Sequence, residues 1–167
     1  MKTTFVPDTA VITSLARVGL AFEMPDTYNQ VSYLGRGEHE TYADRNRSGR
    51  IGILPHRCRA YVPLLCEPQA TGNRTDVRWV NLTDEAGNGL TFRSDKHFQF
   101  SVIPFTDMNV DKATHINELK RTGVVTVHLD AEQSGVGTAT CGPGVLPQYL
   151  VPVQKHTFEF MIRPLAK

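Results

Sequence analysis

The sequence predicts an all-β protein with antiparallel strands, and three observations support that prediction. Hydrophobic residues alternate with polar or small residues at a period of two in four segments, which is typical of strands with one buried and one solvated face. Clusters of Gly, Asn, Asp, Ser and Pro separate these segments and indicate turns. A single stretch has helical spacing instead. The alternating segments are residues 18–24, 98–104, 125–129 and 158–162.

Turn-forming residues set the boundaries of the predicted strands. Pro25 ends the segment 18–24, because proline has no amide hydrogen to donate to a strand ladder. The run Asp84–Gly89 contains an asparagine between two glycines and predicts a hairpin loop. The strands that this loop joins would lie at residues 77–82 and 90–92.

The stretch with helical spacing predicts a short crossover helix between two strands. Thr106 or Asp107 can cap this helix, which would run through Ala113 to Leu119. Its members at intervals of three or four share one face, and on that face we expect a packed histidine. The residues of that face are Met108, Lys112, His115 and Leu119.

The chain has the size of one domain. It has 167 residues, of which 40% are hydrophobic, enough for a globular core. No repeat or linker divides it, so we expect a single β-sandwich domain over residues 14–167, with one long irregular loop near residues 134–144. Residues 1–13 are expected to be the least ordered.

Composition excludes several classes of partner. Lys and Arg number 18 against 17 Asp and Glu, so the net charge is +1. This balance argues against nucleic acid binding and against a polybasic membrane-surface protein. No apolar run approaches the ~18 residues of a membrane span. We expect no signal peptide in this stretch, which leaves cytoplasmic and periplasmic locations both open.

The common patterns for metal binding and nucleophilic catalysis are missing from the sequence. The six histidines have no chelating spacing, so no metal site is expected. The three cysteines are an odd number, and only Cys58 with Cys66 could pair across a loop. Glu38 and Glu40 suggest the two carboxylates of a glycosidase, but the arginines around them favour structural ion pairs.

Charged and aromatic residues gather in the run 73–79. If Arg74, Asp76 and Arg78 alternate along one strand face, they form a charged ladder. Trp79 would then point to the opposite face, where we expect it in the core, although a single Trp is also a common platform for sugar stacking. Arg74, Asp76 and Trp79 are therefore candidate sugar-binding residues.

Three ordered segments carry a family resemblance. The first segment is residues 33–45 (YLGRGEHETYADR), the second is 68–79 (PQATGNRTDVRW) and the third is 135–143 (GVGTATCGP). Together they resemble the C-terminal "small chain" region of glycoside hydrolase family 2 β-galactosidases. The resemblance spans roughly residues 17–163.

The resemblance implies a fold and a place in a larger enzyme. The fold is an antiparallel β-supersandwich like that of galactose mutarotase, of which this chain would be the C-terminal part. In the family the catalytic glutamates lie in a separate TIM-barrel domain, which hydrolyses terminal β-D-galactosides with retention. The resemblance thus implies no catalytic residue and no cofactor in this segment. Any requirement for Mg²⁺ or Na⁺ would belong to the parent barrel.

The third segment implies a contact with the galactoside substrate. In the family this loop reaches the barrel and helps to form the rim of the sugar pocket. Some members have a Trp where this chain has Cys141, so the aromatic platform would be missing here; a Cys141 simply packed in the loop is the alternative. The rim residues implied are Thr138, Thr140, Cys141 and Gly142.

Two other functions and one assembly state stay open at this point. The chain could be a stand-alone, non-catalytic carbohydrate-binding module. It could also be an active mutarotase, which would need an acid/base pair such as His97 or His128 with a glutamate. A partial sandwich would also expose strand edges and apolar faces, which favour homo-oligomers.

Overall fold

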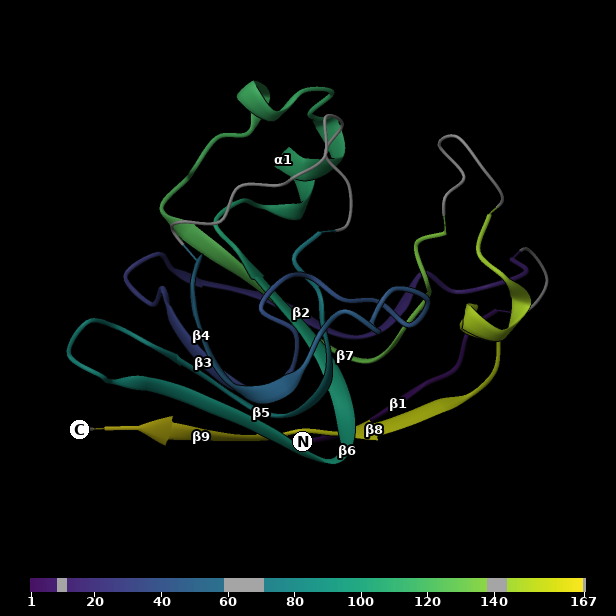
Figure 1. The fold of residues 1–167 in the computed structure, drawn as a ribbon, viewed down its shortest axis with the longest axis horizontal. Coiled ribbons are helices and arrows are strands. Elements are labelled where there is room, and N and C mark those ends of the chain that lie inside the picture. The colour runs from purple at the N-terminus through teal and green to yellow at the C-terminus, as the bar shows by residue number, and fades with distance from the viewer. Residues whose placement is uncertain (9–11, 59–70, 138–143, 167) are drawn as a thin grey trace.

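The predicted all-β antiparallel fold is confirmed in the computed structural model, which describes residues 1–8, 12–58, 71–137 and 144–166 (Figure 1). A seven-stranded sheet has the order β2-β7-β6-β5-β3-β4, with β9 beside β6, and β1 pairs with β8 in a second, two-stranded sheet. All pairings are antiparallel. The strands are β1 (Lys2–Phe5), β2 (Arg17–Pro25), β3 (Gln30–Arg36), β4 (Ile51–Arg57), β5 (Arg74–Thr83), β6 (Gly89–Ile103), β7 (Val124–Gln133), β8 (His156–Glu159) and β9 (Met161–Leu165).

The first alternating segment forms β2, which pairs with β7 along its whole length. Pro25 is the last residue of β2, as its lack of an amide hydrogen predicts. The register shifts between Val18 and Gly19. A Cβ atom at Gly19 would lie 2.2 Å from the carbonyl oxygen of Leu129, so this close approach of two strands requires glycine.

The predicted hairpin between β5 and β6 is also confirmed. The amide of Asp84 donates to the carbonyl of Asn88 at 2.9 Å, and the amide of Asn88 donates to Oδ1 of Asp84 at 2.9 Å. Gly87 has a φ of 90°, in the left-handed region that glycine enters at no steric cost. The turn therefore forms from local chemistry.

β6 has 15 residues, and it changes partners along its length. Its first part pairs with β5 and β9, and its last part pairs with β5 and β7. In between, Val77 faces Phe98 while Trp79 faces Arg93, so Arg78 alone lies opposite the four residues 94–97. On either side of this bulge the two halves of β6 pair with different strands, the first half with β9 and the second half with β7.

The alternating segment 158–162 is not one strand. It divides at Phe160 into β8, which pairs with β1, and β9, which pairs with β6. The amide of Phe160 donates to the carbonyl of Met1 at 2.9 Å instead of to a sheet ladder, and the ring of Phe160 is buried. Within residues 1–13, for which low order was expected, Lys2–Phe5 forms strand β1.

The predicted helix is shorter than the sequence indicated. Helix α1 covers Asp107–Lys112 and begins at the cap Thr106, whose hydroxyl accepts from the amide of Asn109 at 3.2 Å. It ends because the carboxylate of Glu118 accepts from the amide of Thr114 at 2.8 Å and stabilises a separate 3₁₀ turn, η2 (Ile116–Glu118). A second 3₁₀ turn, η3, covers Pro147–Tyr149.

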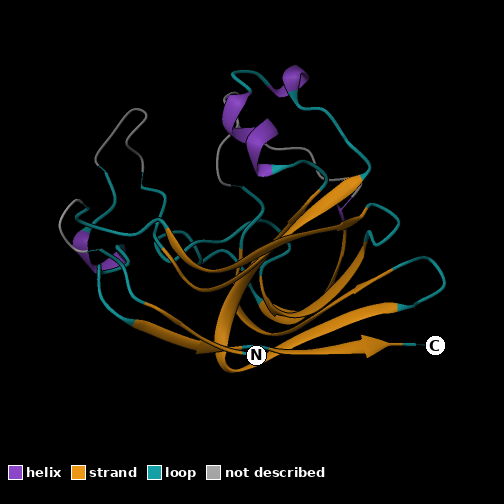
Figure 2. Ribbon diagram, turned by 180° about the vertical axis from the view of Figure 1, so that it is seen from behind, coloured by secondary structure: helices purple, strands orange, loops and turns teal. Residues whose placement is uncertain are grey.

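The prediction that His115 and Leu119 share a face with Met108 is therefore wrong. The side chain of His115 is 73% exposed instead of packed. Helix α1 lies in the connection between β6 and β7, which are direct neighbours in the sheet. Figure 2 shows that this connection projects beyond one end of the strands.

The core lies against one face of the large sheet. It is rich in aromatic rings, and Tyr33 meets Phe100 edge-on with ring centroids 5.0 Å apart. Its fully buried members include Tyr33, Val80, Leu82, Phe92, Phe98, Phe100, Val127, Leu129 and Phe160. No helix in the described part of the chain is long and apolar enough to cross a membrane.

Candidate functional site

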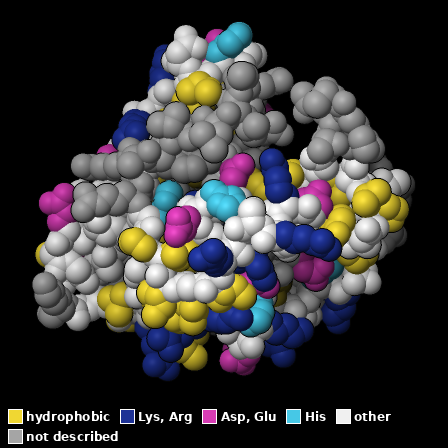
Figure 3. Space-filling view, viewed as in Figure 1, with side chains coloured by type: hydrophobic (Ala, Val, Ile, Leu, Met, Phe, Trp, Pro, Cys, Tyr) yellow, Lys and Arg dark blue, Asp and Glu magenta, His cyan; other side chains and the backbone are white. Residues whose placement is uncertain are grey.

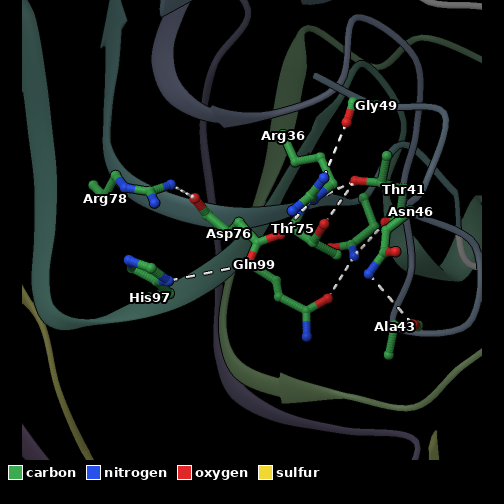
Figure 4. Close-up of polar contacts among 11 residues, drawn as sticks. Arg36, Thr41, Ala43, Asn46, Gly49, Thr75, Asp76, Arg78, His97 and Gln99 are labelled. Carbon is green, nitrogen blue, oxygen red and sulfur yellow. Dashed lines mark hydrogen bonds and ion pairs between the residues drawn. The ribbon is translucent and has the colours of Figure 1, made fainter. Parts of the chain in front are cut away.

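The first and second segments are joined outside the regular strand ladders. The amide of Thr41 donates to the carbonyl of Asn73 at 2.8 Å, and the side-chain amide of Asn73 donates back to the carbonyl of Thr41 at 2.9 Å. Oγ1 of Thr41 accepts from the amide of Thr75 at 3.0 Å. The Asn73 side chain also donates to Gln99 on β6 at 2.7 Å, so this junction is fastened to the sheet (Figure 4).

Glu40 adds a second connection between the same segments. Its Oε2 accepts from the amide of Gly72 at 2.9 Å and from the hydroxyl of Thr71 at 3.2 Å. Glu38, in contrast, is exposed, and its backbone carbonyl accepts from Arg74. The two glutamates therefore lie in different environments, and these contacts give Glu40 a structural role.

Arg74 is buried in this junction. Its Nε donates to the hydroxyl of Tyr33 at 3.2 Å, and its Nη1 donates to the carbonyls of Gly72 and Asn73 at 3.0 and 3.1 Å. Burial raises the pKa of Tyr33, and the Arg74 charge opposes that shift. The tyrosine hydroxyl donates in turn to the carbonyl of Gly37. The guanidinium thus joins the middle of β3 to the start of β5.

Asp76 occupies the irregular part of β5. Its φ is 54°, and the register shifts on either side of Val77, so the predicted regular alternation of Arg74, Asp76 and Arg78 is not found. Oδ2 of Asp76 accepts from Nε of Arg36 at 2.5 Å, and its backbone carbonyl accepts from Arg78 at 2.5 Å (Figure 4). The Asp76 carboxylate therefore forms its salt bridge with a residue of β3.

Trp79 is half-buried on the face of the large sheet that points away from the core, which we call the outer face. The expectation of a core position is therefore wrong. It lines a cavity of about 500 Å³ together with Arg78, Arg93 and Arg163. The three candidate sugar-binding residues thus have separate surroundings. Arg74 lies against Tyr33, Asp76 against Arg36 of β3, and Trp79 faces outward.

The first segment also holds the base of the third. Oδ1 of Asp44 accepts from the amide of Val136 at 3.1 Å, and Oδ2 accepts from the amide of Gly137 at 2.7 Å. A Cβ atom at Gly135 would lie 2.5 Å from Cγ of Asp44, so only glycine allows this approach. The four rim residues implied by the resemblance, Thr138, Thr140, Cys141 and Gly142, lie outside the described residues.

A Ser-His-Asp arrangement that the sequence analysis missed lies beneath α1. Nδ1 of His128 is 3.1 Å from Oγ of Ser101, and its Nε2 is 2.9 Å from Oδ2 of Asp107. Ser101 is buried while Asp107 is exposed, so the hydroxyl has no access to a substrate. Burial lowers the pKa of His128, and the positive charge of Arg17 adds to that shift. The arrangement ties the start of α1 to β7.

Among the described residues, neither histidine considered for mutarotase chemistry forms a hydrogen bond or a salt bridge with a glutamate. His128 has the partners just described, and Nδ1 of the exposed His97 lies 4.0 Å from Asp76. Burial raises the pKa of the Cys58 thiol to about 12, so it is not a nucleophile. In residues 1–8, 12–58, 71–137 and 144–166, no three His, Cys, Asp or Glu side chains gather in a way that could hold a metal ion.

The fold and the junction together define an all-β protein in which the described parts of three segments, far apart in the chain, contact one another. The chain matches the family model of the β-galactosidase small chain over residues 1–162. It is 36% identical over 146 residues to the β-galactosidase of Kluyveromyces lactis. The aligned residues cover 86% of this chain and 14% of that protein. The chain therefore belongs to the β-galactosidase small chain family.

Other relatives give the same result. The chain is 30% identical over 152 residues to a β-galactosidase of an Arthrobacter species, covering 88% of the chain and 15% of that protein. It is 27% identical over 153 residues to the β-galactosidase of Priestia megaterium, covering 90% and 15%. The chain thus spans about a seventh of the length of the curated relatives that it matches.

Proposed function

We propose that the chain is the C-terminal β-sandwich segment of a family 2 β-galactosidase that hydrolyses terminal β-D-galactosides with retention. In this proposal it buttresses the catalytic TIM barrel and supplies residues 138–142 to the rim of the sugar pocket. One observation carries the role of the loop: Asp44, in the first segment, holds the backbone of Val136 and Gly137 at the base of the third. Family membership supports the rest.

The chemistry of a retaining glycosidase requires two carboxyl groups about 5 Å apart, one as nucleophile and one as acid/base. Glu38 and Glu40 are a poor match for these roles, because Glu40 is engaged by the amide of Gly72 while Glu38 is exposed. We therefore assign the catalytic pair, and any metal ion that it needs, to the barrel. The chain's own contribution is to position a loop through charge-assisted hydrogen bonds.

A chimeric enzyme tests this proposal. This chain replaces the matching 146-residue segment of the K. lactis β-galactosidase. We expect the chimera to hydrolyse o-nitrophenyl β-D-galactoside, and we expect no hydrolysis by the isolated chain or by the K. lactis protein without that segment. NMR of the sugar first released from the chimera should show the β anomer. Hydrolysis by the isolated chain, or a folded but inactive chimera, would contradict the proposal.

A stand-alone carbohydrate-binding module is the second candidate, because Trp79 lines a cavity beside arginines and carboxylates. Trp79 is the single tryptophan of the chain, so its fluorescence reports on that cavity alone. A segment that forms one wall of a pocket should bind galactose and lactose with Kd values of about a millimolar or weaker. Micromolar binding that Trp79→Ala abolishes would favour the module instead.

A further inference from the structure

One row of residues crosses five strands on the outer face of the large sheet. Leu34 pairs with Ile53 on one side and with Trp79 on the other. Trp79 pairs with Arg93, which pairs with Met161. Directly paired residues point to the same face of a sheet, so the five side chains lie side by side. We call this set the outer row; it consists of Ile53, Leu34, Trp79, Arg93 and Met161.

The outer row exposes large apolar side chains. Ile53 is 70% exposed and Met161 is 46% exposed, and Ile51, two residues before Ile53 on β4, is 47% exposed. The adjacent paired row, Tyr33, Val80 and Phe92, points to the other face and is fully buried. Three neighbouring apolar residues, Ile53, Leu34 and Trp79, with Met161 beyond Arg93, differ from the scattered single hydrophobic residues of ordinary protein surfaces.

Positive charge borders the apolar side chains. Arg78, Arg93 and Arg163 line the cavity beside Trp79, against the two carboxylates of Asp95 and Glu159, so the lining has one more positive than negative group. Figure 3 shows hydrophobic side chains and Lys or Arg side chains adjoining along the lower strands of the face drawn. Two copies that met on this face would each bring this excess positive charge, and neither would compensate the other. The charge therefore favours an acidic partner over a second copy.

We propose that the outer row is the surface on which this domain docks against the rest of its β-galactosidase polypeptide, and that the partner surface is apolar opposite Ile53, Leu34 and Trp79 and acidic opposite the arginines. The inference rests on the proposed function, because the matched part of this chain covers only 14–15% of the length of its relatives. Burial of Ile53 and the Trp79 indole would supply the apolar contact. The three arginines would bind carboxylates of the partner.

Two variants test this surface, each in the isolated chain and in the K. lactis chimera. Ile53→Asp places a charge at the β4 end of the outer row, and Arg93→Glu reverses the charge beside Trp79. The matched control is Met108→Asp on α1, where Met108 is 66% exposed. In the isolated chain all three variants should unfold at the temperature of the parent chain, because each changed side chain is solvated. This comparison separates a docking defect from a folding defect.

In the chimera, Ile53→Asp and Arg93→Glu should accelerate thermal inactivation by about tenfold or more, because a buried or opposed charge is costly at an interface. Met108→Asp should inactivate at the rate of the unsubstituted chimera. Unchanged inactivation of an active Ile53→Asp chimera would refute the docking surface and leave the proposed function intact. A folded chimera without hydrolysis would contradict both.

Sedimentation of the isolated chain tests the alternative that a second copy of the chain occupies the outer row. The docking surface predicts a monomer at micromolar concentration, because the arginines oppose self-pairing. A dimer that Ile53→Asp or Arg93→Glu dissociates would assign the outer row to a second copy of the chain and overturn the inference.

Discussion

The carboxylate of Asp44 accepts a hydrogen bond from the amide of Gly137 at 2.7 Å, although 93 residues separate the two in sequence. With the amide of Val136 on its other oxygen, the carboxylate fixes the chain where the third segment begins. Asp44 follows Thr41 and Tyr42, which are buried in the junction with the second segment. The contact therefore fixes the start of the proposed rim loop relative to the sheet.

Asp44→Asn should weaken this contact. The substituted amide presents an NH₂ group to one of the two backbone N–H groups, so one hydrogen bond and the negative charge are lost. We expect the free energy of unfolding of the chain to fall by about 2 kcal/mol in urea titrations. In the chimera, kcat for o-nitrophenyl β-D-galactoside should fall. Asp111→Asn on the exposed side of α1 is the control, and equal effects of both variants would contradict the role of Asp44.

Gly135→Ala should disturb the same contact from the other side. The added methyl group would lie 2.5 Å from the Asp44 carboxylate and would displace it. We expect a loss of about 1–3 kcal/mol in thermal or urea unfolding. Gly144→Ala is a matched control, because a Cβ atom there meets no atom within 4 Å. Since both changes act on one contact, Gly135→Ala should cost little more once Asp44→Ala is present; additive losses would disprove the connection.

Arg74→Met should destabilise the chain strongly. The substitution leaves the buried hydroxyl of Tyr33 and the carbonyls of Gly72 and Asn73 without their charged donor. We expect a loss of about 3 kcal/mol or more, measured by urea unfolding. Arg47→Met at an exposed position should change little. A sugar-binding defect in an Arg74 variant would thus reflect lost structure, unless its unfolding curve matches that of the parent chain.

His56 should make the stability of the chain depend on pH. Burial, with the Arg74 charge as the next cause, lowers its pKa from 6.5 to about 4. As the pH falls below 6.5, His56 becomes protonated in the unfolded state but stays neutral in the folded state. The stabilisation that neutral His56 contributes to the free energy of unfolding is therefore lost between pH 6.5 and about 4. This loss amounts to about 3 kcal/mol at most.

Urea titrations across that pH range measure the effect. His56→Gln should remove much of the decline in stability, whereas His115→Gln at an exposed site should retain it. If the two variants had the same pH profile, the decline would have to come from groups other than His56.

Local chemistry explains why part of the fold could be predicted. The loop Asp84–Gly89 forms its turn from its own residues, and Pro25 stops β2 through its own missing amide hydrogen. The segment 158–162 was harder, because alternation shows which residues share a face but not which strand they will pair with. Phe160 leaves the ladder to bond Met1, a partner at the other end of the chain.

The site was less predictable, because bulges and distant contacts define it. A perfect alternation would place Trp79 in the core, but the register shifts of β5 around Val77 place it outward. The contact of Asp44 with Gly137 involves no spacing that a sequence pattern records. The family motifs did indicate the three segments that the structure joins, and the structure added which side chains join them.

The burial of Cys58 determines how this protein will respond to thiol chemistry. With a pKa of about 12 and no exposed surface, its sulfur is almost entirely in the unreactive thiol form at neutral pH. Any alkylation of the native chain by iodoacetamide would then report on the other two cysteines, Cys66 and Cys141. Once Cys66 is replaced, a chemical label on Cys141 could thus follow the proposed rim loop of this chain without prior removal of Cys58.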